Sequence, residues 1–105
     1  PAANMVMPHG VKLPAYGVYA VRVQLGQQRY AAVANFGVKP TFGHQHSPLL
    51  EVHLFDFSGS LYGRLMQVEF IRHIRAEKRF ASLAELTAAI AQDCIAAKAA
   101  LQAIA

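Results

Sequence analysis

The chain has 105 residues, of which 54% are hydrophobic and 15% charged. This length allows one domain, over residues 1–105, and this composition excludes a disordered chain. The single cysteine, Cys94, excludes an internal disulfide framework and favours a reducing, cytoplasmic setting. We expect no membrane partner, because no apolar run approaches the ~20 residues of a membrane helix and the N-terminus lacks a signal-peptide pattern. The net charge of +4 suits an anionic partner, but the basic residues are too scattered to predict nucleic-acid binding.

The first part of the chain reads as a series of strands. Residues 1–17 are rich in Pro, Gly and Ala without a period, which predicts an irregular segment. Four later segments are rich in β-branched and aromatic residues and are predicted to be strands: residues 18–25, 29–36, 49–57 and 64–74. The links between them are mostly short, so we expect antiparallel pairing.

After Phe80 the apolar period changes from two to about 3.6, which predicts a helix. Ser82 is a favourable N-cap, and Glu85 three residues later completes a capping box. One apolar stripe is expected to face the sheet, and it comprises Leu83, Leu86, Ile90, Cys94, Ala97, Leu101 and Ile104. Strands followed by one helix predict an all-β core, a small barrel, with the helix packed on it.

The strand predicted at residues 49–57 places a carboxylate among aromatic residues. Val52 and Leu54 fall on one face, because side chains alternate along a strand. The opposite face carries Glu51, His53, Phe55 and Phe57. A carboxylate on such a face is costly unless it is paired, so it either has a structural partner or takes part in chemistry.

Other polar groups give weaker signals. The loop at residues 35–41 offers Asn35, Lys39 and Thr41 to a phosphate, but the same residues also suit ordinary turn chemistry. No glycine-rich motif for a helix-borne phosphate site is present. Four histidines are spaced too loosely, and without a completing Cys or carboxylate pair, to predict a transition-metal site: His44, His46, His53 and His73.

Six motifs together resemble the riboflavin kinase family. They occur in order and with matching spacing over nearly the whole chain, and they resemble most closely the C-terminal kinase module of bacterial bifunctional riboflavin kinase/FAD synthetase. They are Gly17–Val23, Ala34–Thr41, Leu50–Phe57, Leu61–Gly63, Ile74–Phe80, and the helix start at Ser82–Leu83 with Asp93 beyond it. The resemblance implies a six-stranded antiparallel Greek-key barrel with a C-terminal helix at about residues 82–103.

The resemblance also implies a reaction and a set of site residues. The reaction is transfer of the ATP γ-phosphate to the ribityl 5′-hydroxyl of riboflavin, giving FMN, with Mg²⁺ or another divalent metal. Glu51 aligns with the family's catalytic base, and Asn4 with a metal ligand. The nucleotide-binding positions are Asn4, Asn35, His53 and Tyr62, and the flavin-binding positions are Arg75 and Phe80. An N-terminal FAD synthetase (adenylyltransferase) domain is the partner expected in the parent chain.

The chain departs from the family pattern near its start. The family motif Pro-Thr-x-Asn matches at Pro1 and Asn4, but Ala2 replaces the threonine whose hydroxyl would bind the metal. The family's glycine-rich flap lies before this motif, outside the sequence. These departures predict impaired nucleotide use. Two alternatives to a kinase therefore stay open, which are a non-catalytic flavin- or nucleotide-binding barrel and, less favoured, a small barrel that binds nucleic acid.

Overall fold

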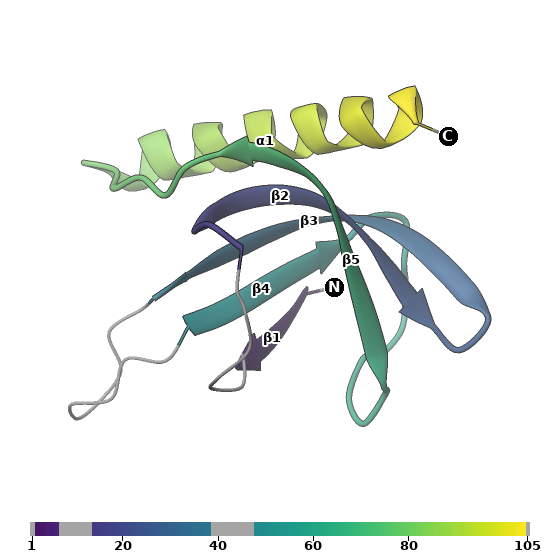
Figure 1. The fold of residues 1–105 in the computed structure, drawn as a ribbon. Coiled ribbons are helices and arrows are strands. Elements are labelled where there is room, and N and C mark those ends of the chain that lie inside the picture. Colours follow the sequence, from purple (N-terminus) through teal and green to yellow (C-terminus); the bar gives the residue numbers. More distant parts are fainter. Residues whose placement is uncertain (1, 7–13, 39–47, 105) are drawn as a thin grey trace, which may run out of the picture.

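The computed structural model describes residues 14–38 and 48–104, together with the backbone of residues 2–6. Within these ranges one sheet and one helix form (Figure 1). The strands are β1 (Ala2–Val6), β2 (Gly17–Leu25), β3 (Gln28–Val38), β4 (Pro48–Leu54) and β5 (Met66–Arg75), and the helix is α1 (Leu83–Ala103). All strand pairs are antiparallel, in the order β1-β4-β3-β2-β5.

The expected fold is confirmed in its coarse outline and corrected in detail. An antiparallel sheet with a C-terminal helix is present, but the described residues form five strands instead of six and no closed barrel. Closure requires the two edge strands to pair, and no pairing between β1 and β5 occurs in the described part of the chain. Residues 1–17 are also not irregular throughout, since Ala2–Val6 pairs with β4. Its small residues lack the alternation that would have identified a strand.

The sheet has an apolar core on each face. One face carries the larger cluster, in which Phe36, Leu50 and Val52 are at most 1% exposed. Met66, Val68 and Phe70, at alternate positions of β5, pack against this cluster. The other face carries Ala20 and Phe55, which pack with Ala97, Ala100 and Leu101 of the helix. Figure 1 shows α1 lying across β2 and β3, on the face of the sheet that carries Ala20.

Helix α1 begins at the predicted N-cap, Ser82, but the predicted capping box is only half formed, because Glu85 accepts from the residue before Ser82. The backbone N–H of Glu85 donates to the Ser82 hydroxyl at 3.1 Å, and the Ala81 N–H donates to the Glu85 carboxylate at 3.0 Å. The predicted inward stripe is only half correct, because Ala97 and Leu101 are buried while Leu83 is 78% exposed. The C-terminal half of the helix lies on the sheet, and the N-terminal half leaves apolar side chains uncovered.

Strand β4 ends at Leu54, three residues earlier than predicted. Asp56 has a φ of 55°, which breaks the alternation of side chains along the strand. Phe55 therefore packs under the helix, whereas Phe57 joins the opposite core, on the face of Val52 and Leu54. The expectation that Phe57 shares a face with Glu51 is wrong for this reason.

Candidate active site

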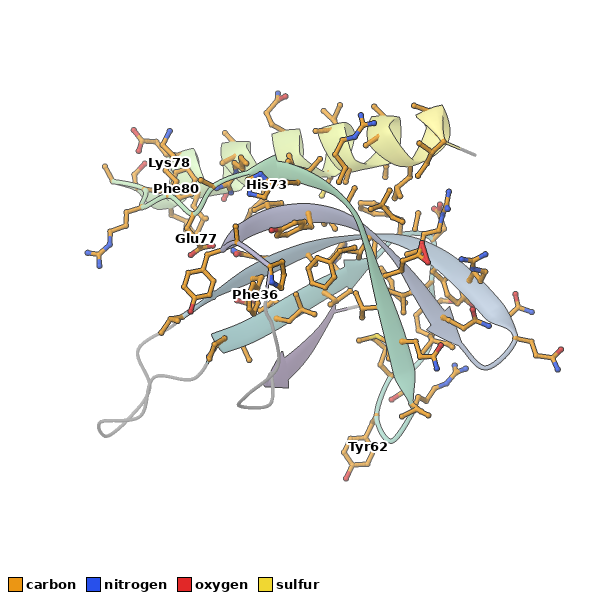
Figure 2. The ribbon with its side chains drawn as sticks, viewed as in Figure 1. Phe36, Tyr62, His73, Glu77, Lys78 and Phe80 are labelled. Atoms are coloured by element: carbon orange, nitrogen blue, oxygen red, sulfur yellow. The ribbon has the colours of Figure 1, made fainter. Side chains whose placement is uncertain are left out.

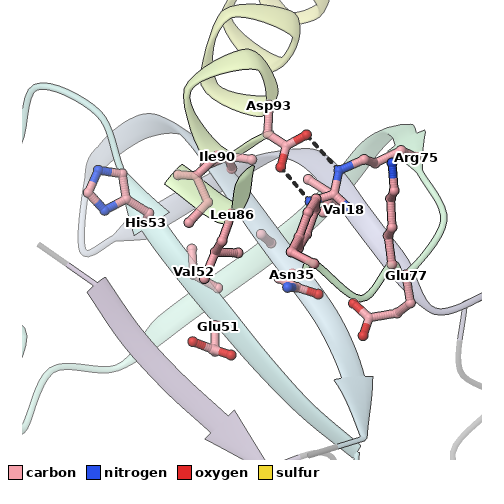
Figure 3. Close-up of a pocket in the computed structure, with 14 residues that line it drawn as sticks. Val18, Asn35, Glu51, Val52, His53, Arg75, Glu77, Leu86, Ile90 and Asp93 are labelled. Carbon is pink, nitrogen blue, oxygen red and sulfur yellow. Dashed lines mark hydrogen bonds and ion pairs between the residues drawn. The ribbon is translucent and has the colours of Figure 1, made fainter. Parts of the chain in front are cut away.

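A cavity of about 470 Å³ lies between the N-terminal half of α1, the adjoining sheet surface and the segment that follows β5 (Figure 3). It exists because α1 covers only part of this face of the sheet. The residues that line it come from β2, β3, β4, the end of β5, residues 77–80 and the helix. They include both polar groups and apolar side chains, which is typical of small-molecule sites.

The polar positions form one row across the sheet. Glu51 in β4 lies opposite Asn35 in β3 and, on its other side, opposite Asn4 in β1. Asn35 in turn lies opposite Val18 in β2, which lies opposite Arg75 at the end of β5. Paired residues of an antiparallel sheet share a face, so Glu51, Asn35, Val18 and Arg75 all reach the cavity.

A second row supplies His53. It stands two residues after Glu51 in β4, on the same face, and its side chain is exposed while lining the cavity. Its neighbour across the β3 pairing is Val33, and across the β1 pairing it is Ala2. Ala2, at the position where the family has a threonine, therefore lies opposite His53, in the row next to that of Glu51.

The lining of the cavity also includes apolar side chains. Leu86 and Ile90 of α1 are among them, and they remain 37% and 49% exposed. Val18, Val33 and Phe80 also line the cavity. Uncovered apolar surface of this kind favours a ligand with a flat, apolar part.

One ion pair joins the helix to the sheet at the edge of the cavity. The Nε and Nη2 groups of Arg75 donate to the two carboxylate oxygens of Asp93, each at 2.8 Å (Figure 3). Asp93 is only 7% exposed. Hydrogen bonding to Asp93 is the largest cause of a pKa of Arg75 raised above its ordinary value, although burial opposes it. The guanidinium is therefore charged at any working pH.

The segment after β5 is held on two sides. The guanidinium carbon of Arg75 lies 5.4 Å from the centre of the Phe80 ring. The carboxylate of Glu77 lies against Gly37 at the end of β3, where an added Cβ would be 2.7 Å from one of its oxygens. Figure 2 shows Glu77, Lys78 and Phe80 together beside the start of α1.

Five of the predicted site residues line this one cavity: Glu51, Asn35, His53, Arg75 and Phe80. Asn4 occupies the register position opposite Glu51, and its side chain lies outside the described residues, as do His44 and His46. Tyr62 is not brought to the cavity. It is 97% exposed in the β4–β5 connection, on a different part of the molecule from Phe80 (Figure 2). Its role in nucleotide binding stays a prediction.

Sequence reasoning missed several residues of the cavity. Asp93 gives no local signal beyond its place in a motif, because its contact with Arg75 spans 18 positions. The spacing of Leu86 and Ile90 predicts a buried stripe, but spacing carries no information on how far a helix is covered. In the described part of the chain, no cluster of three or more His, Cys, Asp or Glu residues that could hold a metal is present.

Comparisons with known proteins identify the family of the chain. The family model described as Flavokinase, riboflavin kinase, matches residues 1–101. The chain therefore belongs to the riboflavin kinase family, whose members phosphorylate riboflavin to FMN.

The curated relatives bear the name bifunctional riboflavin kinase/FMN adenylyltransferase. The protein from Pseudomonas fluorescens is 44% identical over 94% of this chain and 32% of its own length. The proteins from Escherichia coli K12 and Bacillus subtilis are 46% and 38% identical, over 31% and 30% of their lengths. The chain thus spans about a third of these relatives.

A solved structure has the same fold. It is titled a macrolide-efflux protein from Streptococcus pneumoniae and superposes with a TM-score of 0.80 at 33% identity, over 93% of this chain and 32% of that one. In the described residues, no helix has both the length and the apolar character needed to cross a membrane.

Proposed function

We propose that this chain forms a domain that transfers the γ-phosphate of ATP to the 5′-hydroxyl of riboflavin, giving FMN and ADP. The observation that carries the proposal is the position of Glu51 in the lining of the cavity. The carboxylate stands in one row with Asn35 and the register position of Asn4, and Leu86, Ile90 and Phe80 line the same cavity. Apolar and aromatic side chains beside a carboxylate suit a substrate that carries both a flat ring and a hydroxylated chain.

Glu51 is the proposed general base. As the riboflavin hydroxyl oxygen bonds to the γ-phosphorus, the bond from that phosphorus to the β–γ bridging oxygen breaks and ADP leaves. Glu51 takes the hydroxyl proton and later returns it to water, so that protons balance. Base assistance of this type contributes about 10²- to 10⁴-fold to the rate. Holding both substrates in line supplies the larger share in phosphoryl transfer.

Asn4, Asn35 and His53 are the residues proposed to bind the nucleotide. Tyr62, which does not line the cavity, is a further candidate. Mg²⁺ prefers oxygen ligands and keeps several waters, so an amide and a carboxylate in adjacent register positions suit it. When bound, the ion would neutralise charge on the transferred phosphate. Ala2 lacks the hydroxyl that the family uses there, and we propose that nucleotide use is weaker as a result.

The longer relatives suggest the wider context of the domain. Because their names include FMN adenylyltransferase, we propose that the parent protein also carries an adenylyltransferase domain. A six-stranded closed barrel and a cytoplasmic location are further proposals of this kind. They are supported by the family alone.

The test is phosphate transfer from ATP to riboflavin, measured together with quenching of flavin fluorescence as a separate readout of binding. We expect Glu51→Gln to lower kcat at least ~10²-fold while flavin binding is kept. Glu69→Gln is the matched control, because Glu69 is a β5 carboxylate outside the cavity, and it should leave both readouts unchanged.

Each alternative has its own result. Equal kcat for Glu51→Gln and Glu69→Gln would show that Glu51 is not the base. Flavin binding without transfer, even in Ala2→Thr, would favour a non-catalytic flavin-binding domain. An unaltered protein that neither binds flavin nor transfers phosphate, in the presence of Mg²⁺ and ATP, would refute the proposed function.

A further inference from the structure

We propose that Asp93 is a positioning residue, which acts through Arg75 to hold the wall of the cavity that receives the flavin ring. The proposal rests on the proposed function, because it assigns a role to a residue within that same site. It is carried by the geometry of Asp93, which joins the helix, the end of β5 and the segment at residues 76–80.

The ion pair leaves Arg75 little freedom. Two of its nitrogens bind the two oxygens of Asp93, and Nη1 donates to the carbonyl of Ala76 at 3.2 Å. A bidentate pair fixes the plane of a guanidinium as well as its position. One N–H on each terminal nitrogen is left over from these three contacts.

The fixed guanidinium in turn helps to hold Phe80. The Phe80 ring lies 5.4 Å from the Arg75 guanidinium and 5.7 Å from the Lys78 ammonium, distances at which the ring face attracts a cation. Residues 76–80 belong to no helix or strand, so side-chain contacts hold this segment, and the Arg75–Phe80 contact is one of them beside that of Glu77 with Gly37. Without Asp93, Arg75 would be free to leave the ring.

Asp93 also balances the charge of Arg75 at this end of the cavity, which Glu77 and Lys78 line as well. Its carboxylate neutralises Arg75, which otherwise would present a partly buried cation beside Leu86 and Ile90. A neutral, apolar surface suits an uncharged ring system, whereas an unpaired guanidinium attracts anions such as phosphate. Asp93 therefore favours the ring of riboflavin at this end over the phosphates of the nucleotide.

The experiment separates a positioning role from a merely structural one. Asp93→Asn keeps the shape of the side chain and removes its charge. In the protein that carries this chain, we expect the KM and Kd for riboflavin to rise about tenfold, with the KM for ATP and the kcat within about twofold of normal. Gln92→Ala changes an exposed residue of the same helical turn and should change nothing.

A double-substitution cycle tests whether Asp93 acts through Arg75. Arg75→Met keeps an apolar stem beside Phe80 and removes the charge. If the proposal is right, Asp93→Asn adds no further loss of riboflavin affinity in the Arg75→Met background. A further loss of the full tenfold there, or an equal rise in the KM for ATP, would overturn it.

Asp93→Glu keeps the proposal testable if Asp93→Asn does not fold. The longer side chain keeps the charge and moves the guanidinium, so we expect a rise of about threefold in the riboflavin KM alone. An unchanged riboflavin KM would refute the positioning role. Failure of the unaltered protein to bind riboflavin would instead refute the proposed function, so the two failures are distinguishable.

Discussion

Replacing Gly17 by alanine tests how the sheet is held together next to the cavity. Gly17 begins β2 with a φ of 150°, a conformation that side chains disfavour. A Cβ at this position would collide with the backbone carbonyl oxygen of Arg75 and would lie 2.6 Å from the Nε2 of His73. A carbonyl in a paired strand cannot move aside cheaply, so β2 and β5 must separate where Arg75 enters the cavity.

Two costs add at this position. Forcing an extra methyl into a packed interior costs about 1–3 kcal/mol. Holding a non-glycine residue at such a φ costs a further ~1–3 kcal/mol. We therefore expect Gly17→Ala to lower the free energy of unfolding by about 4 kcal/mol, a large part of the 5–15 kcal/mol that stabilises a typical domain.

Gly26→Ala is the matched control, because it separates the two costs. Gly26 lies in the β2–β3 turn with a φ of 59°, and an added Cβ there meets no described atom within 4 Å. Gly26→Ala should therefore lower the free energy of unfolding only by the backbone cost of about 1–2 kcal/mol. Urea unfolding gives both values, and thermal unfolding should show a midpoint lowered by about 4–8 °C for each kcal/mol.

This reasoning would be refuted if Gly17→Ala lowered the free energy of unfolding by no more than Gly26→Ala does. That result would mean that the Arg75 carbonyl yields without cost. We also expect Gly17→Ala to weaken flavin binding, since the displaced residue is Arg75, whereas Gly26→Ala should not.

Two further predictions concern the helix and the ion pair. Ser82→Ala should lower the free energy of unfolding by about 1 kcal/mol, because the N–H of Glu85 loses its partner, while Ser58→Ala at an exposed site should change it by less than about 0.5 kcal/mol. Folding raises the pKa of Arg75 above its value in the unfolded chain. The stability that the charged guanidinium contributes is therefore fully present at every pH below the unfolded pKa. It is lost only as the pH rises through the higher pKa of the folded protein. The difference in unfolding free energy between the unaltered protein and Arg75→Met should therefore stay constant from about pH 7 to about pH 10, and a fall in that range would contradict the assignment.

Much of the local structure was predictable because it depends on neighbouring residues. Ser82 caps the helix as predicted, although the Glu85 carboxylate accepts from the N–H of Ala81 and not from that of Ser82, so only half of the capping box forms. The shared face of Glu51 and His53 likewise followed from the period of a strand. The ordered motifs predicted the family, which the matches confirm.

Three features depended on contacts between distant segments. The register that aligns Glu51 with Asn35 and Asn4 arises from two separate strand pairings, and no local pattern specifies it. The exposure of Leu86 and Ile90 depends on how far the helix covers the sheet. The pairing of Arg75 with Asp93 joins two elements across 18 positions.

The sequence by itself determined the family, the strands of residues 18–74, the helix and the face on which Glu51 lies, because motifs, periodicity and capping are read from the chain itself. It did not determine β1, which the pairing with β4 defines. Only the tertiary structure decided that α1 leaves a cavity over the sheet and that Arg75 is held by Asp93. Both result from packing between a helix and a curved sheet, which is set by the sum of many long-range contacts. The sequence alone thus identified Glu51 as the candidate catalytic residue, but it did not identify the cavity wall that α1 forms above the sheet.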